Sequence, residues 1–434
     1  MEGKAFWVVG AGILQIPMIK EAKIWGYHVI ASDMNPDAPG LELADEPVTI
    51  DTYDDKAHVR HAKWLQDHGR NIVGVSTCGA DVAYTVSRVA EALGLPGLRC
   101  QSSRKMRDKA LVRYDLAFEW QVFQPEFKFE RVDQLIRNAN GYTYPCVVKP
   151  TMERASRGVT LVDKAAIMPL AMTKVKPFAQ GGMCLVEERL YGTEHSAELI
   201  FVGKDRPCFF NVVDRIFDYK NGVAMEIGHI NPTRLATSEQ VRIKNMMMKA
   251  ADVLGVNWGP FKCDIIYTRN EDGDPIMPKI LEACARLSGG FDCQATTPIS
   301  QGRNPIRALI ELSVGDDPSE DSLRLTEVRY AACVASFPVP GRIVSAPSSF
   351  VMGEDTNPLQ EAYKLTGVDE IHLIAEIGQD IVSYEHCADR AAFVIAHAEG
   401  YDEAWNIAQT GAGIITEGYE TERIPNDPSE SRAV

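Results

Sequence analysis

The sequence lacks the features that would place the protein in a membrane or in a disulfide-rich class. It has no run of about 18 apolar residues, and its first dozen residues, MEGKAFWVVGAG, hold only a brief apolar stretch, so neither a membrane span nor a signal peptide is expected. Its ten cysteines are scattered without a C-x-x-C pair, which argues against a zinc site and a disulfide framework. We therefore expect a cytoplasmic protein with reduced thiols.

Positive charge is also scarce. The chain carries 45 Lys and Arg against 60 Asp and Glu, which gives a formal net charge of −15. Such a chain is poorly suited to bind a phosphate backbone, so nucleic acid is not an expected partner. The 45% hydrophobic content is typical of a globular protein, and 434 residues are enough for about two to four domains.

The first hundred residues alternate apolar stretches with amphipathic ones, as in AFWVVG followed by LQIPMIKEAKIWG. This alternation predicts an α/β domain with a doubly wound parallel sheet. The turn GAGILQ, with Asp33 at the end of the second strand, matches part of the dinucleotide-binding fingerprint and would fit a nicotinamide-dependent oxidoreductase. Because Gln15 replaces the third glycine, a helix start packed tightly on its strand is the favoured interpretation.

Beyond residue 100 the pattern changes. The basic stretch SSRKMRDKALVRYDLAFEW predicts one helix with a Ser N-cap, in which Arg104 and Arg113 lie on a solvated face. A β-rich α+β region follows, then short strands with a closing helix, and finally a tail rich in Glu, Pro, Asp and Ser that is expected to be mobile. The predicted segments are 1–100, 101–180, 181–324, 325–420 and 421–434.

The stretch ILEACARLSGG places Glu282, Cys284 and Arg286 at every second residue, so in a strand all three share one face. The preceding turn NEDGD predicts a hairpin. A three-residue loop centred on Gly273 would set Asp264 directly opposite Glu282, whereas a two-residue turn would shift this register by one.

Two carboxylates that face each other across a hairpin repel unless a cation lies between them. Magnesium takes hard oxygen ligands from carboxylates and phosphates, and it suits such a gap. The alternative is a pair of exposed acids at the end of a hairpin.

Upstream, the segment YPCVVKP places Lys149 at the end of a strand, and a Ser/Gly loop, TMERASRGV, follows it. A lysine, a loop able to cover phosphate oxygens and a pair of carboxylates together point to ATP with magnesium.

The motifs DKALVRYDL, YPCVVKPTMERASRGV, LVEERLYGTEHSAEL, GPFKCDII and KILEACARLSGG occur in this order. Over roughly residues 102–310 this order resembles the ATP-grasp superfamily. The resemblance implies a multidomain α/β and α+β fold. It would have an N-terminal domain, a small lid-bearing subdomain over 101–180, a large catalytic subdomain over 181–324 and a small mixed C-terminal subdomain.

The resemblance also implies roles for individual residues. ATP phosphates would be bound by Lys109 and Lys149 and covered by the loop 151–158, which contains Ser156 and Gly158. The stretch from Glu187 and Glu188 to Leu190 would read adenine, and Glu194 would hold the ribose. Asp264 and Glu282 would bind magnesium, for which manganese can substitute, and Arg286 would contact the transferred phosphate. The family usually has Glu at Asp264 and Asn at Cys284. We therefore expect either one metal that is held with a water in place of the missing Asn ligand, or a weak second metal site.

Within the superfamily the chain is most similar to the L-amino-acid ligases. Two motifs carry this resemblance, MEIGHINP with Glu226 and His229, and RLSGG with Gly289. It implies that Glu226 and His229 line an amino-acid pocket, although His229 can also be a structural histidine before a proline turn. Gly289 would let the backbone approach the reacting acyl group.

The implied activity is a carboxylate–amine ligase that works through an acyl phosphate and takes an amino acid as one substrate. A carboxylase acting through carboxyphosphate and a non-catalytic ATP-binding module are the alternatives, the latter because of Cys284. The expected partners are small-molecule acids and amines, with a homodimer as the default assembly.

Overall fold

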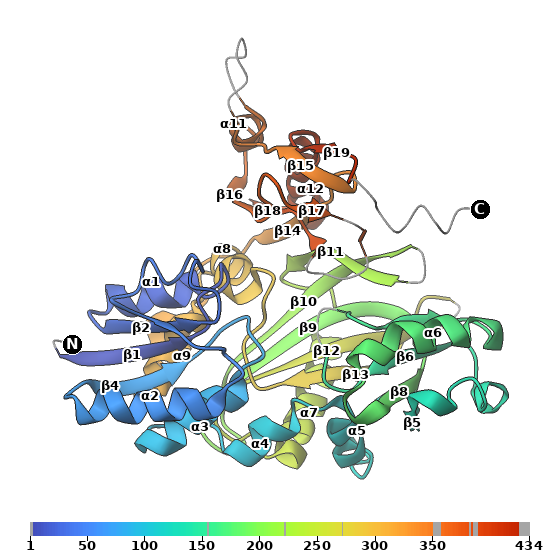
Figure 1. Cartoon of the computed structure of the whole chain (residues 1–434), viewed down its shortest axis with the longest axis horizontal. Helices are drawn as coiled ribbons and strands as arrows, with labels where there is room; N and C mark the ends of the chain where they lie inside the picture. Colours follow the sequence, from blue (N-terminus) through green and yellow to red (C-terminus); the bar gives the residue numbers. More distant parts are fainter. Residues whose placement is uncertain are drawn as a thin grey trace. The chain divides into compact units, whose positions relative to one another are not determined.

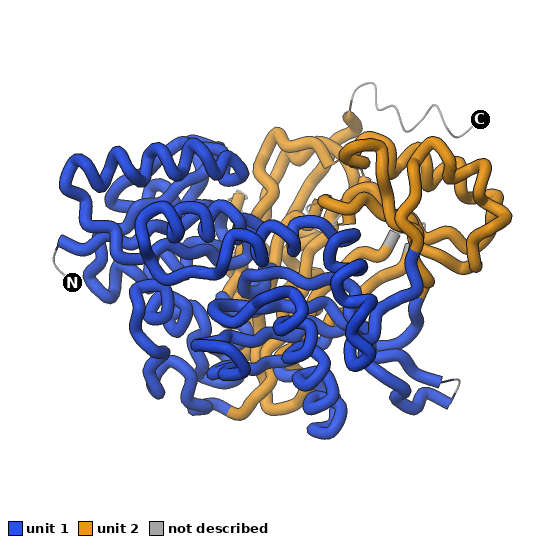
Figure 2. The backbone as a smooth tube through the Cα atoms, turned by 90° about the horizontal axis from the view of Figure 1, so that it is seen from below, with its two compact units in different colours: residues 1–127, 190–214, 232–327 blue, residues 128–189, 215–231, 328–434 orange. Residues whose placement is uncertain are grey.

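The computed structural model describes residues 3–153, 156–220, 223–270, 272–349, 357–381, 383–384 and 389–424. They form two compact units, each built from stretches that are separate in the sequence (Figure 2). Unit 1 comprises residues 1–127, 190–214 and 232–327, and unit 2 comprises residues 128–189, 215–231 and 328–434. None of the helices in the described part of the chain combines the length and apolar character needed to cross a bilayer.

Unit 1 begins with the predicted parallel sheet (Figure 1). Phe6 and Val8 pack with α1 on one face, and Ala5, Trp7 and Val9 pack with α2 and α3 on the other, which explains the unbroken apolar runs in the sequence. The strand order is β3-β2-β1-β4, with all pairs parallel. The elements are β1 (Lys4–Val9), α1 (Ile16–Ile24), β2 (His28–Asp33), β3 (Glu46–Thr49), α2 (Asp55–Asp67), β4 (Asn71–Ser76) and α3 (Ala83–Leu93).

The GAGILQ turn supports the packing interpretation. The Gln15 side chain is buried and donates to the Cys78 carbonyl at 2.5 Å. Both carboxylate oxygens of Asp33 accept backbone N–H groups, from Ala11 and from Asn35, each at 3.0 Å. The acid that would bind a ribose in a dinucleotide site therefore fastens the local backbone instead.

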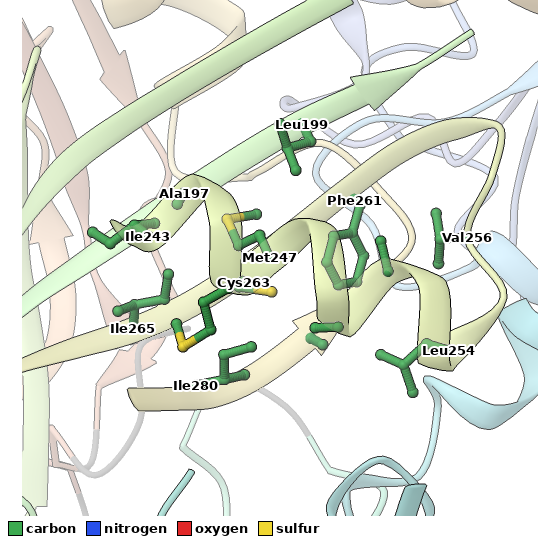
Figure 3. Close-up of a cluster of buried hydrophobic side chains, with 14 of the residues drawn as sticks. Ala197, Leu199, Ile243, Met247, Leu254, Val256, Phe261, Cys263, Ile265 and Ile280 are labelled. Carbon is green, nitrogen blue, oxygen red and sulfur yellow. The ribbon is translucent and has the colours of Figure 1, made fainter. Parts of the chain in front are cut away.

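The rest of unit 1 is built on an antiparallel sheet whose strands are ordered β13-β12-β9-β10. Helix α7 packs its buried face on this sheet, so that Ile243 and Met247 meet Leu199, Phe261 and Cys263 (Figure 3). The elements are β9 (Gly192–Phe201), the first part of β10 (Pro207–Lys220), α7 (Thr237–Leu254), β12 (Gly259–Arg269), β13 (Pro275–Cys284), a π-helix (Asp292–Thr296), α8 (Thr297–Gln301), α9 (Pro305–Ser313) and α10 (Glu320–Leu323).

The single helix predicted from SSRKMRDKALVRYDLAFEW is wrong. Two helices form instead, α4 (Cys100–Lys105) and α5 (Lys109–Leu116). The chain breaks between them because the Asp108 side chain accepts the Ala110 N–H and caps a new helix start. Arg99, not a serine, is the N-cap residue of α4. Arg113 is also not on a solvated face, since it is only 1% exposed.

Unit 2 contains a small sheet ordered β5-β8-β6-β7 and the row of strands β10-β11-β14-β18-β16, into which β10 continues past residue 214. Helix α12 packs on this row through small side chains such as Ala404 and Ala408. A three-stranded sheet is ordered β17-β15-β19. The elements are β5 (Phe127–Arg131), β6 (Cys146–Pro150), β7 (Thr160–Val162), α6 (Met168–Val175), β8 (Met183–Glu188), β11 (Val223–Asn231), β14 (Tyr330–Ser336), β15 (Gly341–Ser345), α11 (Pro358–Tyr363), β16 (Val368–Leu373), β17 (Asp380–Ile381), β18 (Ala392–Ala398), α12 (Tyr401–Glu417) and β19 (Glu420–Glu422).

This architecture confirms the predicted fold class, a parallel α/β domain joined to α+β regions. Three of the predicted segments fall partly on undescribed positions. Residues 154–155 of the expected lid loop, Glu271 of the expected hairpin turn and residues 425–434 of the expected tail lie outside the described residues.

Candidate active site

The β12–β13 hairpin sets Asp264 directly opposite Glu282, as predicted. The predicted route to this register is wrong, however, because Arg269 pairs with Pro275 and the loop is longer than three residues. Two irregularities along the ladder, at Thr268/Arg269 and at Asp264/Ile265, restore the pairing. The second one leaves Leu281 as an extra residue on β13, a β-bulge that turns Glu282 toward Asp264.

Arg113 stabilises this bulge. Its guanidinium donates to the Ile280 carbonyl at 3.2 Å and to the Leu281 carbonyl at 2.6 Å. The Ile280 N–H donates to the Phe123 carbonyl at 2.8 Å. A bulge leaves backbone groups without ladder partners, and here a buried guanidinium and a neighbouring loop bind them. The sequence offered only the cluster of basic residues around Arg113 as a signal.

Each of the two opposed acids is paired with a lysine. Lys109, at the start of α5, lies 3.0 Å from Glu282, and Lys262, two residues before Asp264 on β12, lies 2.5 Å from Asp264. Burial by itself lowers the pKa of Lys109, but the charge and the hydrogen bond of Glu282, together with smaller effects of neighbouring groups, outweigh burial and raise it. Two ammonium groups therefore offset the repulsion between the carboxylates. Sequence analysis missed Lys262, although its i, i+2 spacing from Asp264 was a visible signal.

The donor set at this hairpin fits magnesium through its two carboxylates only. Cys284 is 6% exposed, and burial, helped by Asp81 and Glu282, raises the pKa of its thiol to about 12. A thiol held neutral is not a ligand for a hard cation. Among the described residues no group of three His, Cys, Asp or Glu side chains is arranged to hold a metal ion. The protein side therefore supplies two oxygen-donor residues, and phosphates and water would complete the coordination.

Arg286 lies two residues beyond the end of β13 and is held by Asp81, with 2.6 Å between Nε and the carboxylate. Burial lowers the pKa of Arg286, but Asp81 outweighs it and raises the pKa overall. Asp81 was not identified from the sequence. Its signal was its place just after β4, at the carboxyl end of a parallel strand, where polar functional groups gather.

The Ser288–Gly290 backbone is tightly fixed. Glu198 on β9 accepts the Ser288 N–H, and Asp292 accepts the Ser288 hydroxyl at 2.9 Å. Burial raises the pKa of both carboxyl groups, and the charge of Glu198 adds to the effect on Asp292. A Cβ on Gly289 would lie 3.2 Å from Leu14 Cδ1 and 3.3 Å from the Gly79 carbonyl oxygen, so a larger residue would require these neighbours to shift.

The remaining expected residues of unit 1 are Glu194 and Leu190. Glu194 is half-buried on β9, where it pairs with Ile266 of β12. Leu190 lies two residues before the start of β9 and is also half-buried. Of the residues expected from the sequence, unit 1 thus holds Lys109, Leu190, Glu194, Asp264, Glu282, Arg286 and Gly289.

Unit 2 holds the expected phosphate lysine and part of the expected adenine hinge. Lys149 on β6 lies 2.5 Å from Glu187 on the antiparallel strand β8, and both side chains are buried. Glu188 ends β8 and is half-buried. In the loop after β6, Ser156 and Gly158 adopt positive φ angles of 62° and 70°, and a Cβ on Gly158 would lie 2.8 Å from the Phe178 ring.

Glu226 and His229, expected from the sequence to line an amino-acid pocket, lie on β11. Glu226 accepts two hydrogen bonds from Arg215, at 2.9 and 3.0 Å, and lies 4.0 Å from Arg390. Burial raises the pKa of Glu226, but the two arginines outweigh it and bring it down to about 2. Burial, with the two arginines, lowers the pKa of His229 to about 4, so its ring is neutral near pH 7. Neither arginine was identified from the sequence.

Residues 142–289 match the family model described as an ATP-grasp domain, in the region where the order of the motifs implied one. Among curated proteins it is similar to formate-dependent phosphoribosylglycinamide formyltransferase from Bacteroides thetaiotaomicron. The two are 24% identical over 253 residues, which cover 56% of this chain and 62% of that protein. The chain thus spans less than two thirds of that relative's length.

Two solved structures share the fold over almost the whole chain. L-amino acid ligase from Bacillus licheniformis has a TM-score of 0.76 and 20% identity, and the match covers 97% of this chain and 99% of that one. Carboxyaminoimidazole ribonucleotide synthase from Aspergillus clavatus, complexed with ATP, has a TM-score of 0.72 and 16% identity, with 96% and 100% covered. At these identities the likeness establishes the fold alone.

Proposed function

We propose that the protein is an ATP-dependent carboxylate–amine ligase, which forms an amide or peptide bond and releases ADP and phosphate. The observation that carries the proposal is the opposed pair Asp264 and Glu282 in a chain with an ATP-grasp domain. Each acid is already matched with an ammonium group. Such a site can exchange its counter-ions for a metal and phosphates, which is what ATP-driven chemistry requires.

The chemistry follows from the poor reactivity of a carboxylate, whose leaving group would be oxide. Transfer of the ATP γ-phosphoryl group to the carboxylate gives an acyl phosphate. An amine then attacks the acyl carbon, loses a proton, and phosphate departs. Arg286 and Lys149 offset the charge on the phosphoryl oxygens, and the Gly289 backbone accommodates the acyl group.

We propose the same nucleotide contacts that the resemblance implies. Lys109 joins Lys149 at the phosphates, Ser156 and Gly158 belong to the covering loop, Glu187 to Leu190 read adenine, and Glu194 holds the ribose. Asp264 and Glu282 would hold magnesium or manganese, which supplies positive charge to the phosphates when bound. Cys284 takes no part in metal binding, because its thiol is neutral and buried.

An amino acid is the proposed substrate class. The fold likeness to an L-amino acid ligase supports it, as does the position of Glu226 and His229 on one strand. In this proposal His229 acts as a neutral hydrogen-bonding group. Glu226 would meet a substrate ammonium while it is still bound by Arg215.

The first experiment measures ADP release from ATP and magnesium with pools of amino acids, each with and without bicarbonate or formate. Signal that depends on an amino acid supports the proposal and names one substrate. Glu282→Ala should abolish this signal. Asp274→Ala removes an exposed acid near the turn of the same hairpin and serves as the matched control. Full turnover by Glu282→Ala would contradict the proposal.

A carboxylase that activates bicarbonate is the second candidate. The observation in its favour is the shared fold with carboxyaminoimidazole ribonucleotide synthase. It predicts ADP release that requires bicarbonate and ignores amino acids. ATP binding without ADP formation in any mixture would instead favour a non-catalytic module.

A further inference from the structure

Lys262 lies between two carboxylates on one face of the central sheet of unit 1. On its own strand it shares a face with Asp264, two residues along, and lies 2.5 Å from it. Across the ladder it stands directly opposite Glu198 of β9 on one side and Cys284 of β13 on the other. Directly opposed residues have Cβ atoms about 5 Å apart, so a lysine reaches either acid by a change of side-chain rotamer.

Glu198 is an incomplete acceptor. Its side chain is 1% exposed, and one of its oxygens accepts the Ser288 N–H. The other oxygen, Oε2, is buried and has no hydrogen-bond partner among the described residues. A buried carboxylate oxygen without a partner is costly, and an ammonium group nearby would remove that cost.

We propose that Lys262 is a positioning residue with two partners: it binds Asp264 when no metal is present and moves to Glu198 when a divalent cation takes Asp264. The inference rests on the metal site of the proposed function. It explains why a lysine is buried beside an expected metal ligand, where its positive charge would otherwise oppose cation binding. The unpartnered oxygen of Glu198 is the destination that makes the exchange favourable.

The exchange would couple the metal site to the loop that holds the acyl group. Glu198 fixes the Ser288 backbone, and Ser288 directly precedes Gly289. An ammonium arriving at Glu198 would complete the hydrogen bonding of this carboxylate and hold the Ser288–Gly290 backbone more firmly. Metal binding would thereby order the loop before the reaction starts.

The test measures Mn²⁺ binding to the full chain by electron paramagnetic resonance, without nucleotide. Lys262→Met removes the competing ammonium, and we expect Mn²⁺ to bind roughly three- to tenfold more tightly. Glu198→Gln removes the negative charge to which Lys262 would move but keeps an acceptor for the Ser288 N–H. We expect this variant to bind Mn²⁺ more weakly by a similar factor. Lys262→Arg keeps the charge if Lys262→Met folds poorly, and Lys279→Met, on the neighbouring strand opposite Ile266, is the matched control.

Hydrogen exchange of the peptide that contains Ser288 provides the second readout. We expect Mn²⁺ to slow its exchange in the natural protein and in Lys279→Met, but not in Lys262→Met or Glu198→Gln. Unchanged or weaker Mn²⁺ binding by Lys262→Met, or Mn²⁺-dependent protection that survives in it, would overturn the inference and leave the ligase proposal intact. Mn²⁺ binding that Asp264→Asn does not reduce would overturn both.

Discussion

Two acid clusters of this protein contrast in how their charge is balanced. In unit 1, Asp264 and Glu282 each face a lysine, and their side chains are 13% and 31% exposed. In unit 2, Glu226 is bound through both oxygens by Arg215, with Arg390 nearby. A lysine is a flexible point charge, whereas a bidentate arginine fixes both distance and orientation.

This difference between lysine and arginine pairing indicates which cluster can change partners. The lysine-paired acids can release an ammonium to a metal or a phosphate, because a lysine is a flexible point charge and both acids are partly exposed. The arginine-paired acid would lose two aligned hydrogen bonds, and the neighbouring neutral His229 cannot replace them. The first cluster is therefore suited to exchanging its partners, and the second to keeping Glu226 in one orientation.

The largest expected effect is the loss of turnover in the exchangeable cluster. Glu282→Gln removes the charge that a metal needs but keeps the side-chain size. We expect ADP release to fall at least about a thousandfold, while the melting temperature changes little. A substrate-saturated ADP assay together with thermal denaturation checks both halves of this prediction. Wild-type rates of ADP release by Glu282→Gln would show that the exchangeable cluster is not needed for turnover.

In the fixed cluster the loss should appear as stability. Glu226→Ala leaves the half-buried Arg215 and Arg390 without this carboxylate, and we expect a loss of about 3–5 kcal/mol in the free energy of unfolding. Chemical denaturation measures it, with Glu188→Ala at the end of β8 as a control acid. A change below about 1 kcal/mol would show that the arginines are satisfied without Glu226.

The buried Arg113 binds the β-bulge that positions Glu282 of the exchangeable cluster. Arg113→Met deprives the Ile280 and Leu281 carbonyls of their donor, and we expect a loss of about 2–4 kcal/mol in stability. Because the bulge sets Glu282 opposite Asp264, Mn²⁺ binding should weaken as well. Arg104→Met, on the exposed part of α4, is the matched control. If Arg113→Met folds and binds Mn²⁺ with unaltered affinity, the bulge is not needed for metal binding.

His229 adds a pH dependence to the fixed cluster. Its pKa falls from 6.5 to about 4 on folding, chiefly through burial, so between these values the unfolded chain binds the extra proton. Stability should therefore fall as the pH drops from about 6.5 to about 4. Denaturation curves of the natural protein and His229→Gln across this range should differ in slope. Parallel curves would contradict the lowered pKa.

The smallest effect is expected at an exposed lysine–acid pair of unit 1 that belongs to neither cluster. Lys204 and Asp252 lie 3.1 Å apart with side chains 66% and 57% exposed. Asp252→Asn should change the free energy of unfolding by only about 0–1 kcal/mol, because water screens exposed pairs. Chemical denaturation of Asp252→Asn in low and high salt measures this change, with which the changes in the two clusters can be compared.

Much of the candidate site was visible in local sequence patterns. The alternation of Glu282 and Cys284 predicted a common face on one strand, since side chains of a strand alternate, whereas Arg286 lies beyond the end of β13. Asp264 was correctly placed opposite Glu282, although the loop length used to reach that pairing was wrong. The bulge that corrects the register depends on Arg113 from a helix far away in the sequence, and local patterns do not contain such contacts.

By itself, the sequence determined the parallel α/β opening, the hairpin, the paired acids and the order of the ATP-grasp motifs, because these follow from short-range periodicity and residue type. Only the tertiary structure decided the partners: Arg113 on the bulge, Asp81 on Arg286, Arg215 on Glu226, and Lys262 between Asp264 and Glu198. Burial creates these pairs. A charge removed from water must find its counter-charge wherever the fold brings one, and that place is not encoded in neighbouring residues.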